Sequence, residues 1–283
     1  MRDKARGLVE HAAGARVTAS RPLSGGCIGE VYHLSLTDGR DLVAKVGGAG
    51  SGLALEGAML QHLAAHGAPV PEVLHADDHL LLMTVVPSGD ALSPRVQEHA
   101  AHVIAALHDN AGPCFGFTFD TVIGGLPQPN PQQERWVPFF RDQRLLFMAG
   151  EAARAGRLPP ATLRRIEALA GRLDDILEEP DHPSLLHGDL WTGNVLAHQG
   201  RLSGLIDPAI YWGHPEVELA FTTLFGTFGD VFFNRYHDLR PIRPGFFEER
   251  LEVYNLYPLL VHVRLFGGGY LGGVDRTLRR LGI

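Results

Sequence analysis

The chain has 283 residues, 45% hydrophobic and 20% charged, which is enough for one large domain or two smaller lobes. Its net charge is −7 with histidines neutral, which argues against general nucleic-acid binding, because such proteins usually carry a basic stripe. The only cysteines, Cys27 and Cys114, are far apart in the sequence, so we expect no disulfide framework. The N-terminal residues lack the apolar core of a signal peptide, and no run approaches the roughly 18 apolar residues of a membrane span. We therefore expect a cytoplasmic protein.

The N-terminal part predicts one helix and an antiparallel sheet. The first 14 residues have helical spacing and end at a glycine, and residues 17–23 have the pattern of a strand. Strands over 31–36 and 42–46 are separated by Asp38-Gly39, a dipeptide that strongly indicates a tight turn between antiparallel strands.

A glycine-rich segment, SGGCIGE, precedes the strand over 31–36. Kinase-like folds cover the phosphates of ATP with the backbone N–H groups of such a turn. The lysine of a Walker motif is absent, which excludes a P-loop NTPase. We therefore expect Gly25, Gly26 and Cys27 to contact phosphates, against the alternative of a plain glycine hairpin. An intermolecular disulfide at Cys27 would block ATP, although a small residue filling a tight turn is the simpler explanation.

Lys45 ends the strand over 42–46, and a predicted helix over 51–66 carries Glu56 near its start. A lysine in this place reaches the α- and β-phosphates in kinases, and a glutamate from the next helix pairs with it. We predict this ion pair. The alternative is a solvated lysine and a glutamate favoured by the helix dipole.

Residues 73–74 and 80–86 predict a further hairpin, which leads into a linker over 87–90. The segment LLLMTVVPSG resembles the last strand and hinge of the small lobe of kinases. By position alone, this resemblance implies that backbone groups near Val85 and Val86 bind adenine, with Met83 lining the pocket. The same resemblance implies one lobe over residues 1–87 that binds ATP and a second over residues 88–283 that binds the acceptor and carries the catalytic residues.

The C-terminal part is mainly helical. Its apolar periodicity predicts helices over 93–108, 135–155, 160–177, 231–239 and 245–271. An irregular segment of unusual length lies between the first two, and its aromatic content argues against disorder.

The most informative stretch is residues 184–207. A short apolar strand leads into a polar loop with His187, Asp189 and Asn194, and two further strands end near Asp207. Phosphoryl transfer needs an oriented hydroxyl and metal ions that neutralise phosphate charge. We expect Asp189 to accept the proton of the attacking hydroxyl, and Asn194 and Asp207 to offer hard oxygen ligands to Mg²⁺. The alternative is a polar hairpin loop whose Asp and Asn only form turns.

This spacing resembles the H-x-D-x-x-x-x-N loop and the later metal-binding Asp of protein kinases. The segments HGDLWTGNVL and LIDPAIYWGHPEVELA are similar to the fructosamine-3-kinase (ketosamine kinase) family, for which Trp191 is the distinguishing residue. The resemblance covers nearly the whole chain. It implies a two-lobed α+β protein-kinase-like fold, with an N-terminal antiparallel sheet plus helix and a mainly helical C-terminal lobe.

The same resemblance implies ATP and Mg²⁺ as cofactors and a ketosamine, such as fructosamine or ribulosamine, as acceptor, free or protein-bound. The phosphorylated hydroxyl would be the one on C3, and the unstable product would release the sugar adduct from its amine. Two alternative interpretations are an antibiotic or choline-type kinase and a non-catalytic nucleotide-binding module. We expect a monomer or a homodimer that binds no nucleic acid and no membrane.

The segment FGF…PQPN…W is one that ketosamine kinases carry and protein kinases lack. The resemblance implies an acceptor pocket here, with Asn130, Trp136, Trp191 and His214 as substrate contacts. For Trp136 the alternative is packing in the core. The wider family has an Asp where this chain has Glu218, so a role for Glu218 in bracing the catalytic loop stays open.

Overall fold

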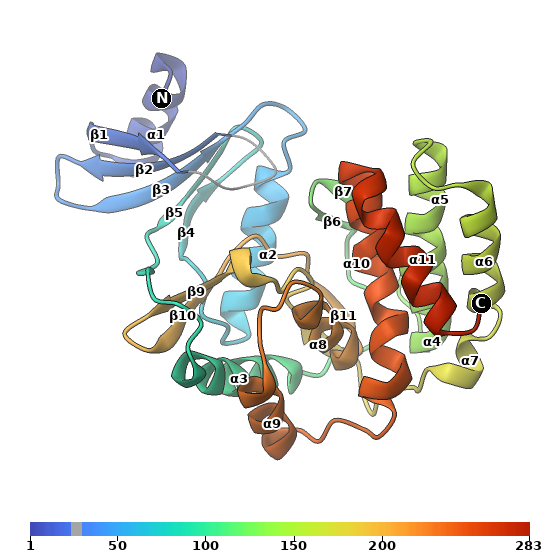
Figure 1. Ribbon diagram of the computed structural model, residues 1–283. Coiled ribbons are helices and arrows are strands. Elements are labelled where there is room, and N and C mark those ends of the chain that lie inside the picture. Colours follow the sequence, from blue (N-terminus) through green and yellow to red (C-terminus); the bar gives the residue numbers. More distant parts are fainter. Residues whose placement is uncertain (24–29) are drawn as a thin grey trace. The chain divides into compact units, whose positions relative to one another are not determined.

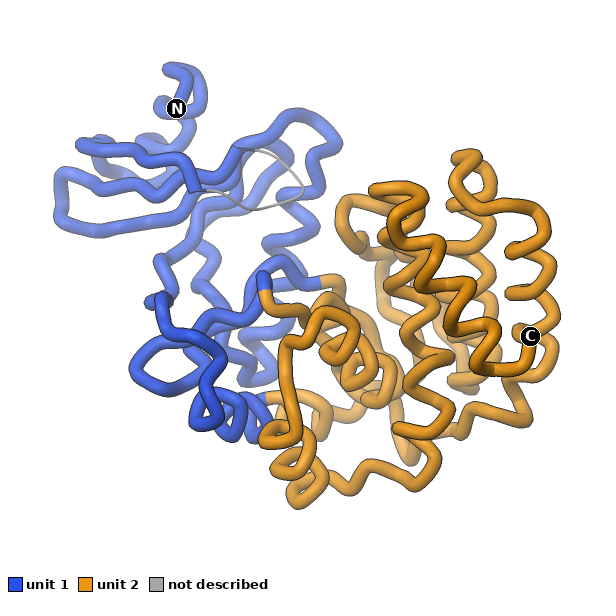
Figure 2. Tube along the Cα trace, viewed as in Figure 1, with its two compact units in different colours: residues 1–103, 193–208 blue, residues 104–192, 209–283 orange. Residues whose placement is uncertain are grey.

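The structure is a computed structural model that describes residues 1–23 and 30–283 (Figure 1). The predictions for Gly25, Gly26 and Cys27 therefore lie outside the described residues. The chain forms two compact units: unit 1 is Met1–Val103 with Gly193–Pro208, and unit 2 is Ile104–Thr192 with Ala209–Ile283 (Figure 2). The two strands after residues 187–194, which we call the catalytic loop after its predicted role, thus pack with the N-terminal residues. A functional boundary after residue 87 stays a prediction.

Unit 1 contains a five-stranded antiparallel sheet in the order β1-β2-β3-β5-β4. Its elements are α1 (Asp3–Ala13), β1 (Val17–Pro22), β2 (Glu30–Leu36), β3 (Asp41–Val46), α2 (Leu53–Ala65), β4 (Val73–Ala76) and β5 (Leu80–Thr84). The predicted turn at Asp38-Gly39 joins β2 to β3, and Gly39 has a φ of 84° that favours glycine. The predicted antiparallel sheet with a helix is therefore confirmed.

Alternating side chains of the sheet form two apolar clusters. Leu80 and Leu82 pack with Val9 of α1, whereas Leu81 and Met83 pack with Leu53 of α2. Because successive side chains of a strand point to opposite faces, β5 is covered by one helix on each face. This packing fixes α2, and with it Glu56, against the sheet that carries Lys45.

A second sheet in unit 1 consists of β9 (Val195–His198) and β10 (Arg201–Leu205), which follow the 3₁₀ turn Thr192–Asn194. The two strands are antiparallel, with Leu205 opposite Val195. Leu205 N–H donates to the Pro69 carbonyl, which ties β10 to the segment between α2 and β4. The residues that flank this ladder, Asn194 and Asp207, are consequently brought to the same end of it.

Unit 2 is mainly helical, and α3 (Pro94–His108) leads into it. Its other helices are α4 (Trp136–Phe140), a π-helical turn Arg141–Leu146, α5 (Phe147–Arg154), α6 (Pro160–Ala170), α7 (Leu173–Ile176), α8 (Pro215–Leu224), α9 (Asp230–Leu239), a π-helical turn Phe246–Arg250, α10 (Leu251–Phe266), a 3₁₀ turn Gly268–Tyr270 and α11 (Leu271–Arg280). The helix α10 packs against α5, α8 and α11 (Figure 1). None of the described helices is long and apolar enough to cross a membrane.

Three predictions for unit 2 need correction. The helix expected over 160–177 is interrupted after Ala170, and the one expected over 245–271 ends at Phe266, where Gly267 has a φ of 84°. The segment expected to be irregular contains a hairpin of β6 (Thr121–Ile123) and β7 (Leu126–Gln128). In addition, β8 (Ser184–Leu186) pairs with β11 (Tyr211–Gly213), a long-range contact that no local pattern indicates.

Candidate active site

In unit 1, Lys45 forms two ion pairs. Its Nζ donates to Glu56 Oε1 at 2.6 Å, which is the predicted pair, and also to Asp207 Oδ1, which was not predicted. The three side chains come from β3, from α2 and from the residues after β10. We call them the lysine cluster.

The lysine cluster joins one cation to two carboxylates in a largely buried place. Burial alone opposes the charge on Lys45, but attraction to Glu56 and Asp207 outweighs it and raises the pKa of Lys45. Burial raises the pKa of Glu56, and the attraction of Lys45 offsets that rise only in part. The side chain of Asp207 is the most accessible of the three, with 28% exposed. The ammonium is thus charged, and Asp207 is the carboxylate that solvent or a ligand can reach.

Asn194 and Asp207 lie together at the end of the β9–β10 ladder. Ile206 N–H donates to the Asn194 carbonyl at 3.1 Å, and Asn194 Nδ2 lies 3.4 Å from the Asp207 carbonyl. Asp207 has a φ of 53°, in the left-handed region that few non-glycine residues adopt, and such outliers gather at functional sites. An amide and a carboxylate both offer hard oxygen donors. The described residues hold no group of three His, Cys, Asp or Glu side chains arranged for a metal, so these two side chains are a small donor set. This small donor set suits Mg²⁺, which usually keeps water and phosphate among its ligands.

In unit 2, the catalytic loop leaves β8 at His187 and carries Asp189. Ala209 N–H donates to the His187 carbonyl at 2.8 Å, so the loop lies against the chain that enters β11. Gly188 has a φ of 83°, and a Cβ there would lie 2.0 Å from the Ala209 carbonyl oxygen. Only glycine fits at this position, which explains the glycine of the HGD sequence in physical terms.

Glu218 of α8 braces this loop from one side. Its carboxylate accepts from Gly188 N–H at 2.6 Å and from His187 N–H at 3.3 Å, and His108 Nε2 donates to it at 2.9 Å. His108 Nδ1 in turn lies 2.8 Å from the Tyr236 hydroxyl. The question that the sequence left open is settled, since Glu218 takes the bracing role in place of Asp. We call these residues the glutamate clamp.

Glu218 is fully buried, and burial alone would raise its pKa. The hydrogen bond and charge interaction with His108, helped by the backbone N–H donors, outweigh burial and lower the pKa of Glu218. The clamp therefore holds an ionised carboxylate against the N–H groups of the catalytic loop. Charge-assisted hydrogen bonds of this kind are about twice as strong as neutral ones.

A second network supports the loop through Ala209. Gln128 Nε2 donates to the Ala209 carbonyl at 2.9 Å, and the Tyr257 hydroxyl donates to Gln128 Oε1 at 2.6 Å. Asn130 Nδ2 donates to Thr121 Oγ1 at 2.9 Å, which also accepts from Gln128. The PQPN segment is thus tied into the scaffold of the catalytic loop.

Asn130 was predicted to contact the acceptor, but its side chain is 2% exposed and its amide oxygen accepts from Arg144 at 2.6 Å. Burial and internal pairing therefore assign Asn130 to this scaffold. An open groove of about 590 Å³ borders the same segment, lined by residues 117–120, 129–132 and Gln143.

Two other predicted acceptor contacts belong to the core of unit 2. Trp136 is fully buried, and its Nε1 donates to the Tyr254 hydroxyl at 3.0 Å, so the packing alternative describes it. His214 is 5% exposed and caps α8, with its Nδ1 accepting from Glu216 N–H at 3.0 Å. Trp191 differs from both, because 40% of it is exposed beside Asp189. It is the remaining candidate for acceptor contact.

The predicted adenine residues lie at the end of β5. Met83 is 4% exposed and packs in the cluster with Leu53, while Val85 and Val86 are half-buried in the strand's continuation. A Cβ on Gly204 would lie 2.7 Å from Val86 Cγ1, so β10 approaches this continuation closely. Adenine binding at Val85 and Val86 stays a prediction.

The fold and these two clusters define a class, the protein-kinase-like phosphotransferases. The structure superposes on the aminoglycoside phosphotransferase APH(4)-Ia with a TM-score of 0.69 at 19% identity, over 96% of each chain, a likeness that shows the fold. Within this class the chain belongs to the fructosamine kinase family, whose model matches residues 1–282.

Two relatives support this assignment. A Thermobifida fusca crystal structure assigned to the fructosamine-3-kinases is 34% identical, with a TM-score of 0.89 over 97% of both chains. A probable ketoamine kinase of Synechocystis is 40% identical over 181 residues, which span 62% of this chain and 59% of that relative. The family resemblance that the sequence motifs indicated is therefore confirmed.

Proposed function

We propose that the protein is an ATP- and Mg²⁺-dependent kinase that phosphorylates a sugar hydroxyl of a ketosamine. The observation that carries the proposal is the catalytic loop, in which the backbone around Asp189 is held by an ionised Glu218 on one side and by Ala209 on the other. The lysine cluster supplies the group that a nucleotide needs, an ammonium held by a carboxylate. Family membership supports the substrate class.

In this mechanism Asp189 accepts the proton of the attacking hydroxyl, and the clamped loop keeps the carboxylate oriented. Lys45 binds the α- and β-phosphates while Glu56 holds its ammonium in place. Asn194 and Asp207 would hold Mg²⁺, which when bound neutralises charge on the phosphates. Because Lys45 also pairs with Asp207, nucleotide binding requires Lys45 to exchange that carboxylate for phosphate oxygens.

The finer assignment is also a proposal. The acceptor is a ketosamine such as fructosamine or ribulosamine, the hydroxyl is the one on C3, and the phosphorylated product decomposes and frees the amine. The names of the relatives, ketoamine kinase and fructosamine-3-kinase, support the acceptor class. A cytoplasmic location fits the free thiol of Cys114.

A substrate panel tests this function. The purified protein is incubated with ATP and Mg²⁺ and with fructosamines, ribulosamines, an aminoglycoside or choline, and the products are identified by mass spectrometry. We expect one added phosphoryl group on ketosamines only. Phosphorylation of the aminoglycoside or choline with ketosamines untouched would overturn the assignment.

Asp189→Asn is the matched variant for the panel. It keeps the size of the side chain but removes the base, so kcat should fall by about 10²–10⁴-fold while calorimetric ATP binding is retained. Turnover at the wild-type rate would show that Asp189 is not the base.

A further inference from the structure

A segment of unit 1 that we call the linker strand, residues 86–90, lies beside β10 of the β9–β10 hairpin (Figure 1). Val86 packs where Gly204 leaves room, since a Cβ on that glycine would lie 2.7 Å from Val86 Cγ1. One residue further on, Ser203, at which the β9–β10 register shifts, donates its Oγ–H to the Pro87 carbonyl at 2.5 Å. Residue numbers rise along the linker strand as they fall along β10, so the two segments run antiparallel.

Asp90 completes this contact at the turn of the hairpin. The turn has two central residues, Gln199 and Gly200, whose φ values of 52° and 71° have the positive sign that a type I′ turn requires. Asp90 Oδ2 accepts from Gly200 N–H at 2.8 Å, and Asp90 N–H donates to the Ala197 carbonyl at 3.1 Å. One residue of the linker strand therefore binds the hairpin on both sides of its turn.

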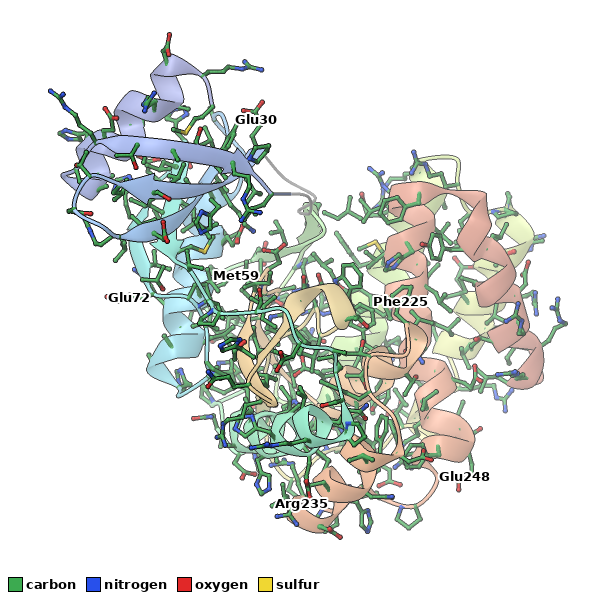
Figure 3. The ribbon with its side chains drawn as sticks, turned by 60° about the vertical axis from the view of Figure 1, so that its left-hand side comes forward. Glu30, Met59, Glu72, Phe225, Arg235 and Glu248 are labelled. Atoms are coloured by element: carbon green, nitrogen blue, oxygen red, sulfur yellow. The ribbon has the colours of Figure 1, made fainter. Side chains whose placement is uncertain are left out.

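The chain is also fixed just before the linker strand begins. Thr84 is the last residue of β5; its N–H donates to the Glu72 carbonyl at 3.0 Å, and its Oγ1 accepts from Glu72 N–H at 3.0 Å (Glu72 is labelled in Figure 3). Val85 and Val86, which are predicted to bind adenine, thus lie between two anchored points. Asp90 itself is exposed, so its side chain can be replaced without disturbing the core of unit 1.

The hairpin carries the proposed metal ligands at the end opposite its turn. Asn194 lies directly before β9, and Asp207 lies two residues beyond Leu205, where β10 ends. The two strands are paired from the turn to Leu205. A movement of the linker strand at the turn is therefore carried through the hairpin to both metal ligands.

Resting on the function proposed above, we propose that Asp90 is a positioning residue that couples adenine binding at the linker strand to Mg²⁺ binding at Asn194 and Asp207. Adenine orders the linker strand, and the bonds of Asp90 carry that order to the hairpin. The two metal ligands then lose less conformational freedom when they bind the ion. By linkage, adenine binding is strengthened by the same factor once the metal ligands are occupied.

Hydrogen exchange tests the first half of this path without metal or phosphate. Exchange of residues 194–205 is followed by mass spectrometry with and without adenosine. We expect adenosine to slow it about fivefold in the wild type, the lower end of ordinary coupling, and to leave it unchanged in Asp90→Ala. Asp90→Asn keeps an oxygen that accepts from Gly200 N–H and should restore the protection. Glu98→Ala, which removes an exposed carboxylate of α3 that makes none of these bonds, is the matched control and should behave as wild type.

Calorimetry tests the second half. The dissociation constant of ATP is measured with and without Mg²⁺, and the ratio of the two constants is compared between proteins. A general loss of structure weakens both and leaves the ratio unchanged, whereas a loss of coupling lowers it. We expect Asp90→Ala to lower the ratio about fivefold, and Asp90→Asn and Glu98→Ala to stay within about twofold of wild type.

Three results in the variants overturn the inference: protection of the hairpin in Asp90→Ala, an unchanged ratio in that variant, or an equal loss in Glu98→Ala. A wild-type hairpin that adenosine does not protect overturns it as well. These binding measurements need no acceptor. A wild type that shows the coupling but phosphorylates no ketosamine therefore removes the proposed substrate class and leaves the role of Asp90 standing.

Discussion

The lysine cluster of unit 1 and the glutamate clamp of unit 2 are built from different kinds of partner. Lys45 is held by two carboxylate side chains, one of them 28% exposed. Glu218 is held by two backbone N–H groups and by His108, and its side chain is 1% exposed. The first set can exchange partners when a ligand arrives, while the second cannot do so without moving the backbone.

This difference separates binding from positioning. An ammonium that bridges two carboxylates can transfer to phosphate oxygens, because Glu56 still holds it after Asp207 is released. An ionised carboxylate inside unit 2 must keep every donor it has, because a buried charge that loses its partners costs several kcal/mol. The lysine cluster should therefore govern nucleotide kinetics, and the glutamate clamp should govern loop geometry and stability.

The largest effect that separates the two is expected from Lys45→Met. The variant loses the phosphate contact, and kcat/KM for ATP should fall by about 10²–10³-fold, the cost of a lost charge-stabilising donor. Stability should change by at most about 1–2 kcal/mol, because Asp207 is partly solvated and Glu56, whose pKa burial already raises, can take up a proton. Steady-state kinetics and thermal melts measure the two quantities. A large loss of stability with ATP kinetics intact would erase the distinction.

The sequence predicted the lysine cluster better than the clamp. Lys45 at the end of a strand and Glu56 early in the next helix are local signals, and the hairpin at Asp38-Gly39 is another. Each depends on periodicity or turn chemistry within a short window, which the sequence records directly.

The clamp depends on contacts between distant segments. His108, Gly188, Glu218 and Tyr236 meet only after α3, α8, α9 and the catalytic loop have packed. No spacing rule indicates that meeting, so the role of Glu218 stayed open and that of His108 was missed. For the same reason the prediction that Asn130 contacts the acceptor differs from the structure, in which its bond to Arg144 lies inside unit 2. The one available signal was polar residues within apolar surroundings, which predicts burial with a partner but not which partner.

A smaller loss of activity but a larger loss of stability is expected from Glu218→Gln. Glutamine replaces one carboxylate oxygen with an NH2 group, so a donor would face the N–H of Gly188 or of His108 and one hydrogen bond would be lost. The free energy of unfolding should therefore fall by about 2–4 kcal/mol. Because the loop backbone loosens, kcat should fall by about tenfold with little change in KM for ATP. Chemical denaturation and steady-state kinetics measure both.

Glu218→Asp is the control for that variant. It keeps the charge but is one methylene shorter, so it should lie between wild type and Glu218→Gln in both measurements. If Glu218→Gln instead raised KM for ATP as Lys45→Met does, the two clusters would act as one and the comparison would fail.

The smallest effect concerns a third way of burying a titratable group, which neither cluster uses. His214 is buried without a counter-ion; burial first, and then the charges of Arg243 and Arg250, hold its pKa well below the usual range. Its Nδ1 caps α8, so protonation would break the bond from Glu216 N–H. The unfolded chain takes up this proton below about pH 6.5 and the folded chain does not. Stability should therefore fall with falling pH, by up to about 1.4 kcal/mol per pH unit for this one proton.

His214→Asn isolates that proton, because asparagine can cap a helix but does not titrate. Unfolding free energies of wild type and variant, measured between about pH 7.5 and pH 5, should converge or cross as the pH falls. Other histidines titrate in both proteins and cancel in the difference. If the two unfolding free energies stayed parallel over this pH range, His214 would take up its proton in the folded state as it does in the unfolded chain. Burial at the start of α8 would then not exclude a charge.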